Sequence, residues 1–201
     1  MSGKQESLGA WSLLAGWTLA SSMGWFLGLG IGTLLTLAAS RLPWLSEDRV
    51  FAYAVLISLG LTTGAAQWIV MRRYLPQPAH WVAGTLVGYL LCLVIVVGGN
   101  LGERWAAGIW DDVLLLGFLG AAIGTAQWWI LRQHYRQAGL WLLATAAGFL
   151  CFVWTIRYPA LSPGQFVLRG TLFGTLAAAV PGAALVWLVH QPSATGSQRT
   201  V

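Results

Sequence analysis

Six apolar runs, each near the length that a helix needs to cross a bilayer, constrain this chain more than any other feature. The runs are Trp17–Ala39, Phe51–Met71, Trp81–Val97, Val113–Leu131, Trp141–Ile156 and Gly170–Val189. A helix needs about 20 apolar residues to span the hydrocarbon core, and no run shows the sustained alternation of a membrane-spanning strand. Charged residues and prolines separate the runs. The sequence therefore predicts an all-α membrane protein with six transmembrane helices joined by short loops.

Composition excludes the other classes of protein. Hydrophobic residues make up 57% of the chain and charged residues 8%, whereas an average soluble domain is about 25% charged. A disordered chain would have far fewer large apolar residues. The two cysteines, Cys92 and Cys151, lie inside apolar runs, which argues against a disulfide scaffold. The first apolar run, from about Trp11 to Ala39, exceeds the 7–15 residues of a signal-peptide core, so we expect it to remain as a span.

An internal repeat of sixty residues runs through the sequence. The segment GLTTGAAQWIVMR at 60–72 recurs as GAAIGTAQWWILR at 120–132, and WVAGTLVGY at 81–89 recurs as WLLATAAGF at 141–149. WTLASSMGW at 17–25 has the same pattern as the second pair. We interpret the chain as one membrane domain, 1–201, that contains three copies of a two-helix unit, at about 11–73, 80–136 and 140–191, with a flexible tail at 192–201.

The third copy is degenerate. Ala178, Gly182, Leu185 and His190 stand where Gly120, Gly124, Gln127 and Arg132 would fall. Because a two-helix unit returns the chain to its starting side, the copies should run parallel and be related by rotation about an axis near the membrane normal.

With these motifs the chain resembles uncharacterised bacterial multi-pass membrane proteins that repeat GxxxGxxQWxxLR followed by WxxxTxxGW. The likeness covers nearly the whole chain and departs from that pattern mildly, at Met71, Tyr89 and Phe149. Membership of the group implies no particular activity. The resemblance adds a bacterial cytoplasmic membrane to the expectations.

Charge distribution predicts the orientation. An even number of spans places both termini on one side of the membrane, together with the segments 72–78 and 132–138. This side has six basic residues and one acidic residue, Glu6, whereas the other side has five of each. Lys and Arg alone differ little between the sides, but the paired Arg72-Arg73 and the close Arg132 and Arg136 favour the terminal side as cytoplasmic.

The repeated motif supplies the candidate site residues. These are Gln67, Trp68, Arg72, Gln127, Trp128 and Arg132. Gly60 and Gly64 share a helix stripe with Gln67, and Gly120 and Gly124 share one with Gln127, which is typical of close helix packing. An amide that faced lipid would have no hydrogen-bond partner, so we expect both glutamines to point into the bundle and to join neighbouring helices by a hydrogen bond. Alternatively, the motif lines a pocket in which the arginines meet an anionic lipid head, or the glutamine is an axial ligand to a pigment metal. By default the motif arginines are interfacial anchors. The tryptophans toward the ends of the runs are expected to mark the membrane interface in the same way, among them Trp17, Trp68, Trp81, Trp128 and Trp141.

These residues favour a protein without catalytic activity. No combination of acid, base, nucleophile and metal ligands is evident, so we expect no enzyme, metal site or cofactor. The basic residues form no patch, which argues against nucleic acid. A scaffold or accessory subunit that contacts lipids and another membrane protein or a second copy is the first hypothesis. Binding of a lipid, isoprenoid or pigment at the motifs is the second. Small-solute transport is the third, with only Pro181 hinting at a broken helix.

Overall fold

The described chain is helical throughout its regular structure. The computed structural model describes residues 2–41, 47–98, 109–151, 153 and 162–191, and no strand occurs among them. The helices are α1 (Ser2–Ala39), α2 (Glu47–Met71), α3 (Ala79–Gly98), α5 (Ile109–Leu131), α6 (Gly139–Leu150) and α8 (Pro163–Val189). All except α6 are long and apolar enough to cross a membrane. The chain is an all-α, multi-pass integral membrane protein, as the sequence predicts.

The helices extend beyond the apolar runs that predict them. α1 begins at Ser2, well before Trp17, and its 38 residues give a length of about 57 Å, more than the ~30 Å hydrocarbon core. α8 begins at Pro163, where Ser162 caps it by accepting a hydrogen bond from the Gln165 backbone at 3.3 Å. Apolar runs mark only the part of a helix that lies in hydrocarbon, so they underestimate helices that continue outside it. The predicted run 141–156 continues past the end of α6, and most of that continuation (residues 152 and 154–156) lies outside the described residues.

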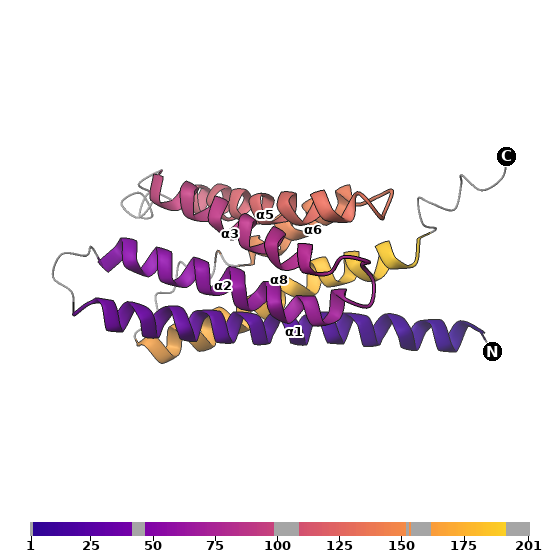
Figure 1. The fold of residues 1–201 in the computed structure, drawn as a ribbon, viewed down its shortest axis with the longest axis horizontal. Helices are drawn as coiled ribbons and strands as arrows, with labels where there is room; N and C mark the ends of the chain where they lie inside the picture. The colour runs from indigo at the N-terminus through magenta and orange to yellow at the C-terminus, as the bar shows by residue number, and fades with distance from the viewer. Residues whose placement is uncertain (1, 42–46, 99–108, 152, 154–161, 192–201) are drawn as a thin grey trace.

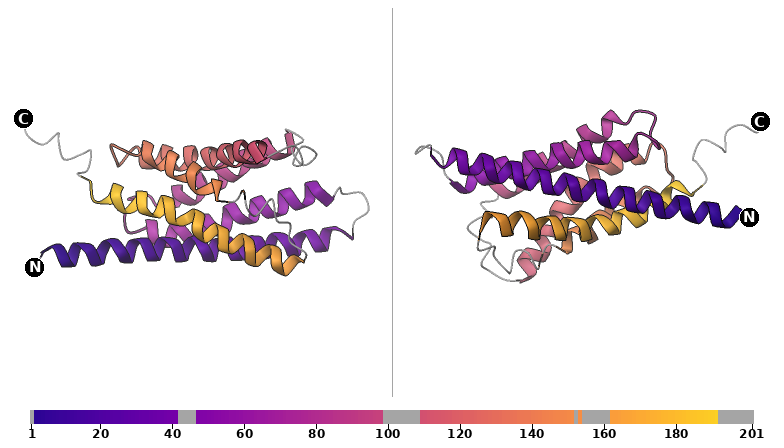
Figure 2. Two further views of the ribbon diagram at one scale, coloured as in Figure 1. Left: turned by 180° about the vertical axis from the view of Figure 1, so that it is seen from behind. Right: turned by 90° about the horizontal axis from the view of Figure 1, so that it is seen from below.

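The six described helices form a closed ring. Each helix packs against the described helix before and after it in the chain, and α8 packs against α1 to close the circle. The start of α1, the end of α8 and the connections after α2 and α5 lie at one end of the bundle (Figure 1). We call this the terminal end. The view from behind in Figure 2 shows α8 lying beside α1.

Glycine lies at every contact around this ring. A Cβ atom on Gly24 of α1 would lie 2.5 Å from the Thr63 Cα atom of α2, and one on Gly88 of α3 would lie 2.7 Å from the Ile123 Cα atom of α5. The backbones therefore approach more closely than any larger side chain permits, which confirms the predicted role of the small residues in helix packing. The contacts between successive helices involve Gly24, Gly28 and Gly32; Gly60 and Gly64; Gly84 and Gly88; Gly120 and Gly124; Gly148; and Gly170, Gly174 and Gly182.

Two apolar clusters fill the ring and leave a polar layer between them. The cluster at the terminal end consists of Leu13, Trp17, Met71, Leu75, Trp81, Leu131, Ala138, Trp141, Leu185 and Leu188. The cluster toward the opposite end includes Trp25, Leu29, Leu59, Tyr89, Leu119 and Ile123. Ser21, Thr63, Gln67, Thr85, Gln127 and Thr145 are buried between them. This polar layer contains the glutamines of the repeated motif.

Candidate functional site

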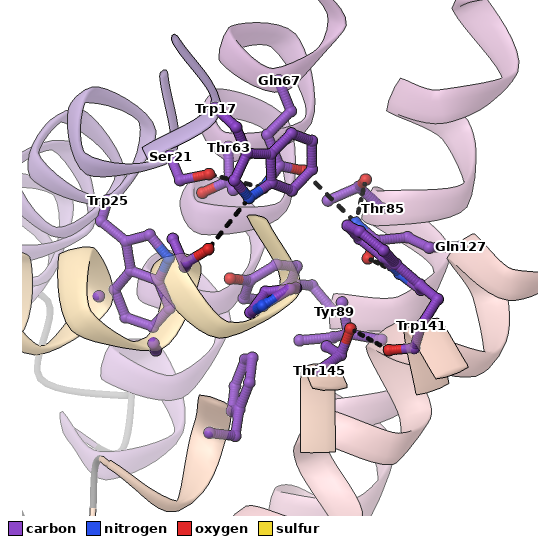
Figure 3. A pocket seen from close by; sticks show the side chains of 16 residues that line it. Trp17, Ser21, Trp25, Thr63, Gln67, Thr85, Tyr89, Gln127, Trp141 and Thr145 are labelled. Atoms are coloured by element: carbon purple, nitrogen blue, oxygen red, sulfur yellow. Dashed lines mark hydrogen bonds between the residues drawn. The ribbon is translucent and has the colours of Figure 1, made fainter. Parts of the chain in front are cut away.

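The motif glutamines lie inside the ring. Gln67 is 6% exposed and Gln127 is 3% exposed, and Figure 3 shows both side chains among residues from other helices. The glycine and glutamine positions share one stripe of α2 and of α5, so the face that packs closely against α3 or α6 also turns the amide inward. The prediction that both glutamines point into the bundle is confirmed.

Gln67 of α2 joins the helices on either side of it. Its Nε2 atom donates a hydrogen bond to the Ser21 hydroxyl of α1 at 3.0 Å. Its Oε1 atom accepts one from the Trp81 indole N–H of α3 at 3.1 Å. A single amide therefore links three consecutive helices.

Gln127 of α5 makes the same pair of contacts sixty residues further on. Its Nε2 atom donates to the Thr85 hydroxyl of α3 at 3.0 Å, and its Oε1 atom accepts from the Trp141 indole of α6 at 3.1 Å. Nε2 also lies 3.4 Å from Gln67 Oε1, which joins the two amides. The glutamines thus form one continuous hydrogen-bond network through α1, α2, α3, α5 and α6, with a clasp in each of the two matching hairpins. We call it the Gln–Trp network.

The last hairpin replaces this clasp with other contacts. Leu185 of α8 stands where the third glutamine would fall, and it is fully buried. The Trp17 indole, which would be its partner across the closed ring, donates instead to the Ala178 carbonyl of α8 at 3.2 Å. The Thr145 hydroxyl donates to the Trp141 carbonyl of its own helix at 2.9 Å. Both groups that a third glutamine would contact therefore have other partners.

Three indole side chains fill the centre of the ring beside this network. Trp17, Trp81 and Trp141 come from α1, α3 and α6, and their exposed fractions are at most 1%. Their ring centroids lie 5.3–5.9 Å apart with interplanar angles of 75–84°, the edge-to-face geometry that aromatic pairs prefer. The three side chains occupy the centre of the ring near the terminal end.

A small hollow of about 40 Å³ lies next to Trp17 and Trp141, lined by residues of all six described helices. The Thr63 hydroxyl lines it and is buried without a hydrogen-bond partner among the described residues. A polar cavity needs roughly 10–15 Å³ to admit a water molecule. The hollow can therefore accommodate a few waters, and its lining contains no ionisable carboxylate, lysine, arginine or histidine.

The rest of the motif points outward. Trp68 and Trp128 are partly exposed, and Arg72 and Arg132 are exposed. The Arg72 guanidinium carbon lies 5.6 Å from the Trp68 ring centroid, and that of Arg132 lies 5.0 Å from the Trp128 centroid. Both pairs have the geometry of a cation–π contact. The structure thus divides the six candidate residues into an inner pair of glutamines and two outer Trp–Arg pairs.

The sequence interpretation of three tryptophans was wrong. Trp17, Trp81 and Trp141 were expected to mark the membrane interface, but they are buried in the ring and provide the indole donors of the polar layer. The WxxxS/T pattern, which places a serine or threonine one turn after each of them, contained the signal. Because a buried indole N–H requires an acceptor, the two buried glutamines were the acceptors to consider.

The site as a whole is polar, uncharged and satisfied mainly by its own side chains. The part of the chain that the structure describes contains no group of three or more His, Cys, Asp or Glu residues that could hold a metal ion. The resemblance of the repeated motif to that of uncharacterised bacterial multi-pass membrane proteins stays a prediction. No known protein family, curated protein or solved structure matches the chain.

Proposed function

We propose that this protein is a non-enzymatic scaffold or accessory subunit of the membrane. The observation that carries the proposal is the closed ring of helices, in which every contact contains glycine and the glutamines bind one another and their neighbours. Interhelical hydrogen bonds inside a bilayer strengthen helix association, and a connected network favours one arrangement of the helices. Such a ring is suited to holding its outer surface in a fixed shape.

The centre of the ring argues against solute transport. Trp17, Trp81 and Trp141 fill it near the terminal end, and the apolar cluster that contains Leu119 and Ile123 fills it beyond the polar layer. Transport sites usually contain an intramembrane charge or an unwound helix. α8 continues as a helix through Pro181, and the residues that line the central hollow contribute no charge.

The Gln–Trp network also argues against a pigment metal at the glutamines. Each amide oxygen accepts an indole N–H, and each amide nitrogen donates to a hydroxyl. A metal ligated there would have to replace these bonds and open the tryptophan cluster. Binding of a lipid is therefore more compatible with the outer Trp–Arg pairs than with the glutamines.

α1 is the best candidate for contact with a partner. It is the least buried of the five long helices, and Figure 1 shows its N-terminal part running past most of the bundle. Leu19, Met23 and Leu34 are 70%, 58% and 68% exposed on its outer face. Another membrane protein or a second copy of this chain would cover these side chains. In the same proposal the terminal end lies in the cytoplasm of a bacterium, because arginines gather there.

A photo-crosslinking amino acid at Met23 tests the proposal in intact membranes. The same substitution at Phe118 of α5 and Leu168 of α8, which are 64% and 66% exposed, provides matched outward-facing controls. The proposal predicts a crosslinked protein of one defined mass from Met23 and only lipid adducts from at least one control position. Lipid adducts alone from all three positions would overturn it. A periplasmic-activity reporter at the carboxyl terminus should be inactive, and an active one would reverse the orientation.

A further inference from the structure

The outer Trp–Arg pairs differ between the two motif copies in a way that points to a ligand. In the second copy the Arg132 guanidinium carbon lies 3.4 Å from the Trp129 ring centroid, in addition to its contact with Trp128. In the first copy the residue equivalent to Trp129 is Ile69, so Arg72 has only one indole. Trp129 and Ile69 are similarly exposed, at 55% and 53%. Arg132 therefore contacts two aromatic rings, whereas Arg72 contacts one.

Stacking leaves the hydrogen-bonding edge of the guanidinium available. A flat contact with an indole uses the face of the guanidinium group, and the N–H donors point outward in its plane. The Arg132 side chain makes no hydrogen bond or ion pair with any described residue. An arginine fixed in this way is preorganised for a planar, two-point interaction with phosphate or carboxylate oxygens.

Glu6, at the start of α1, is the acidic residue that the sequence places toward the terminal end, and none of the described side chains there is a carboxylate that could pair with Arg132. Arg72, Arg73, Arg132 and Arg136 are all exposed there, and segments 9–17, 67–85, 127–145 and 185–191 contain no Asp or Glu. Trp128 and Trp129 lie near the end of α5, and tryptophans near the end of a membrane-spanning helix are typically at the level of the lipid headgroups. Among the described side chains these arginines therefore have no carboxylate counter-charge, so an anion from outside the protein is the partner that their charge favours.

We propose that Arg132, which lies over Trp129 and beside Trp128, binds the headgroup phosphate of an anionic phospholipid, and that Arg72 with Trp68 forms a weaker second site. Negatively charged headgroups attract basic residues close to the membrane surface. The partner of the terminal end is thus a lipid of net negative charge. This inference goes beyond the scaffold role and does not depend on it, since it involves only the outward half of the motif.

The repeat supplies matched variants for the test. The purified full-length chain is placed in nanodiscs of phosphatidylcholine with a minor share of phosphatidylglycerol, and native mass spectrometry measures the lipids that stay bound. Arg132→Gln should weaken retention of phosphatidylglycerol about fivefold. Arg72→Gln should have a smaller effect. Arg49→Gln, which removes an exposed arginine at the opposite end, is the control and should have no effect.

Exchanging the equivalent residues gives the sharper result. Trp129→Ile should reduce the second site to the strength of the first, and Ile69→Trp should strengthen the first. Raised salt should weaken both. Equal retention of phosphatidylcholine and phosphatidylglycerol, or equal losses with Arg132→Gln and Arg49→Gln, would overturn the proposal. Unchanged lipid retention together with loss of a copurifying acidic protein from Arg132→Gln would also overturn it and would identify a protein partner instead.

Discussion

Replacing Gln127 with leucine should lower the free energy of unfolding more than the removal of any single polar contact on the surface of the ring. The side chain makes three hydrogen bonds, to the Thr85 hydroxyl, the Gln67 amide oxygen and the Trp141 indole. Leucine has a similar size, so the substitution removes the hydrogen bonds and leaves the helix packing nearly filled. The loss of stability then reports on the network.

The expected magnitude follows from the contacts that disappear. Interhelical hydrogen bonds in membrane proteins contribute about 0.6 kcal/mol each on average, with a maximum near 1.7. The Trp141 N–H would also remain buried without its acceptor, at a cost of about 1–3 kcal/mol. Partial compensation by the apolar side chain lowers the sum. We expect the free energy of unfolding to fall by about 2–4 kcal/mol.

Unfolding in mixed detergent micelles, followed by circular dichroism, measures this change. Gln133→Leu is the control: Gln133 is exposed, it lies just past the end of the same helix, and among the described residues its amide bonds to the Trp129 carbonyl. Its effect should stay within about 0.5 kcal/mol. A double-mutant cycle with Trp141→Phe isolates the bond between the amide and the indole, and the coupling should be about 1 kcal/mol. Additive effects of the two substitutions, or equal effects at Gln127 and Gln133, would refute the reasoning.

Three further predictions concern the glycine contacts, the last hairpin and Tyr135, and the first two have a matched control variant. Gly88→Ala should lower the free energy of unfolding by about 1–3 kcal/mol because the methyl group would meet the backbone of α5. Gly30→Ala should not destabilise the helix, because an added methyl group would meet no atom of another helix within 4 Å; equal melting temperatures would contradict this. Leu185→Gln should lower the free energy of unfolding less than Leu188→Gln, which is equally buried. Only position 185 corresponds to the two glutamines and so to the Trp17 indole and the Thr145 hydroxyl, which now donate to backbone carbonyls. The reverse order would refute the correspondence of the last hairpin with the other two. Burial and a neighbouring tyrosine raise the pKa of Tyr135, so the stability due to its neutral phenol is complete below about pH 10 and is lost as the pH rises through the raised pKa. Tyr135→Phe should abolish that loss, and an unchanged alkaline unfolding profile would contradict it.

Much of the fold was predictable because membrane helices have a simple sequence signal. Apolar length and the charges between runs predicted the helices, and the spacing of Gly60, Gly64 and Gln67 predicted the inward stripe. The two glutamines were predicted to point away from lipid because an amide that faces lipid has no hydrogen-bond partner. Helix ends were less predictable, since α1 and α8 continue past the apolar residues that define a span.

Residue spacing alone did not predict which side chains would form hydrogen bonds with the glutamines. A tryptophan near a helix end is usually interfacial, and only the ring closure turns Trp17, Trp81 and Trp141 toward one another. Contacts such as Gln67 with Ser21 join residues 46 positions apart. They depend on which helices become neighbours, a property of the whole chain.

The mass of the intact particle in its own membrane tests the scaffold function most directly. The protein is extracted with its surrounding lipid by a copolymer that forms native nanodiscs, and native mass spectrometry records every component that stays bound. We predict a fixed ratio of this chain to another membrane protein, or a defined oligomer, that persists when Arg72 and Arg132 are replaced by glutamine. A chain that is monomeric in every particle and accompanied only by lipid would contradict it.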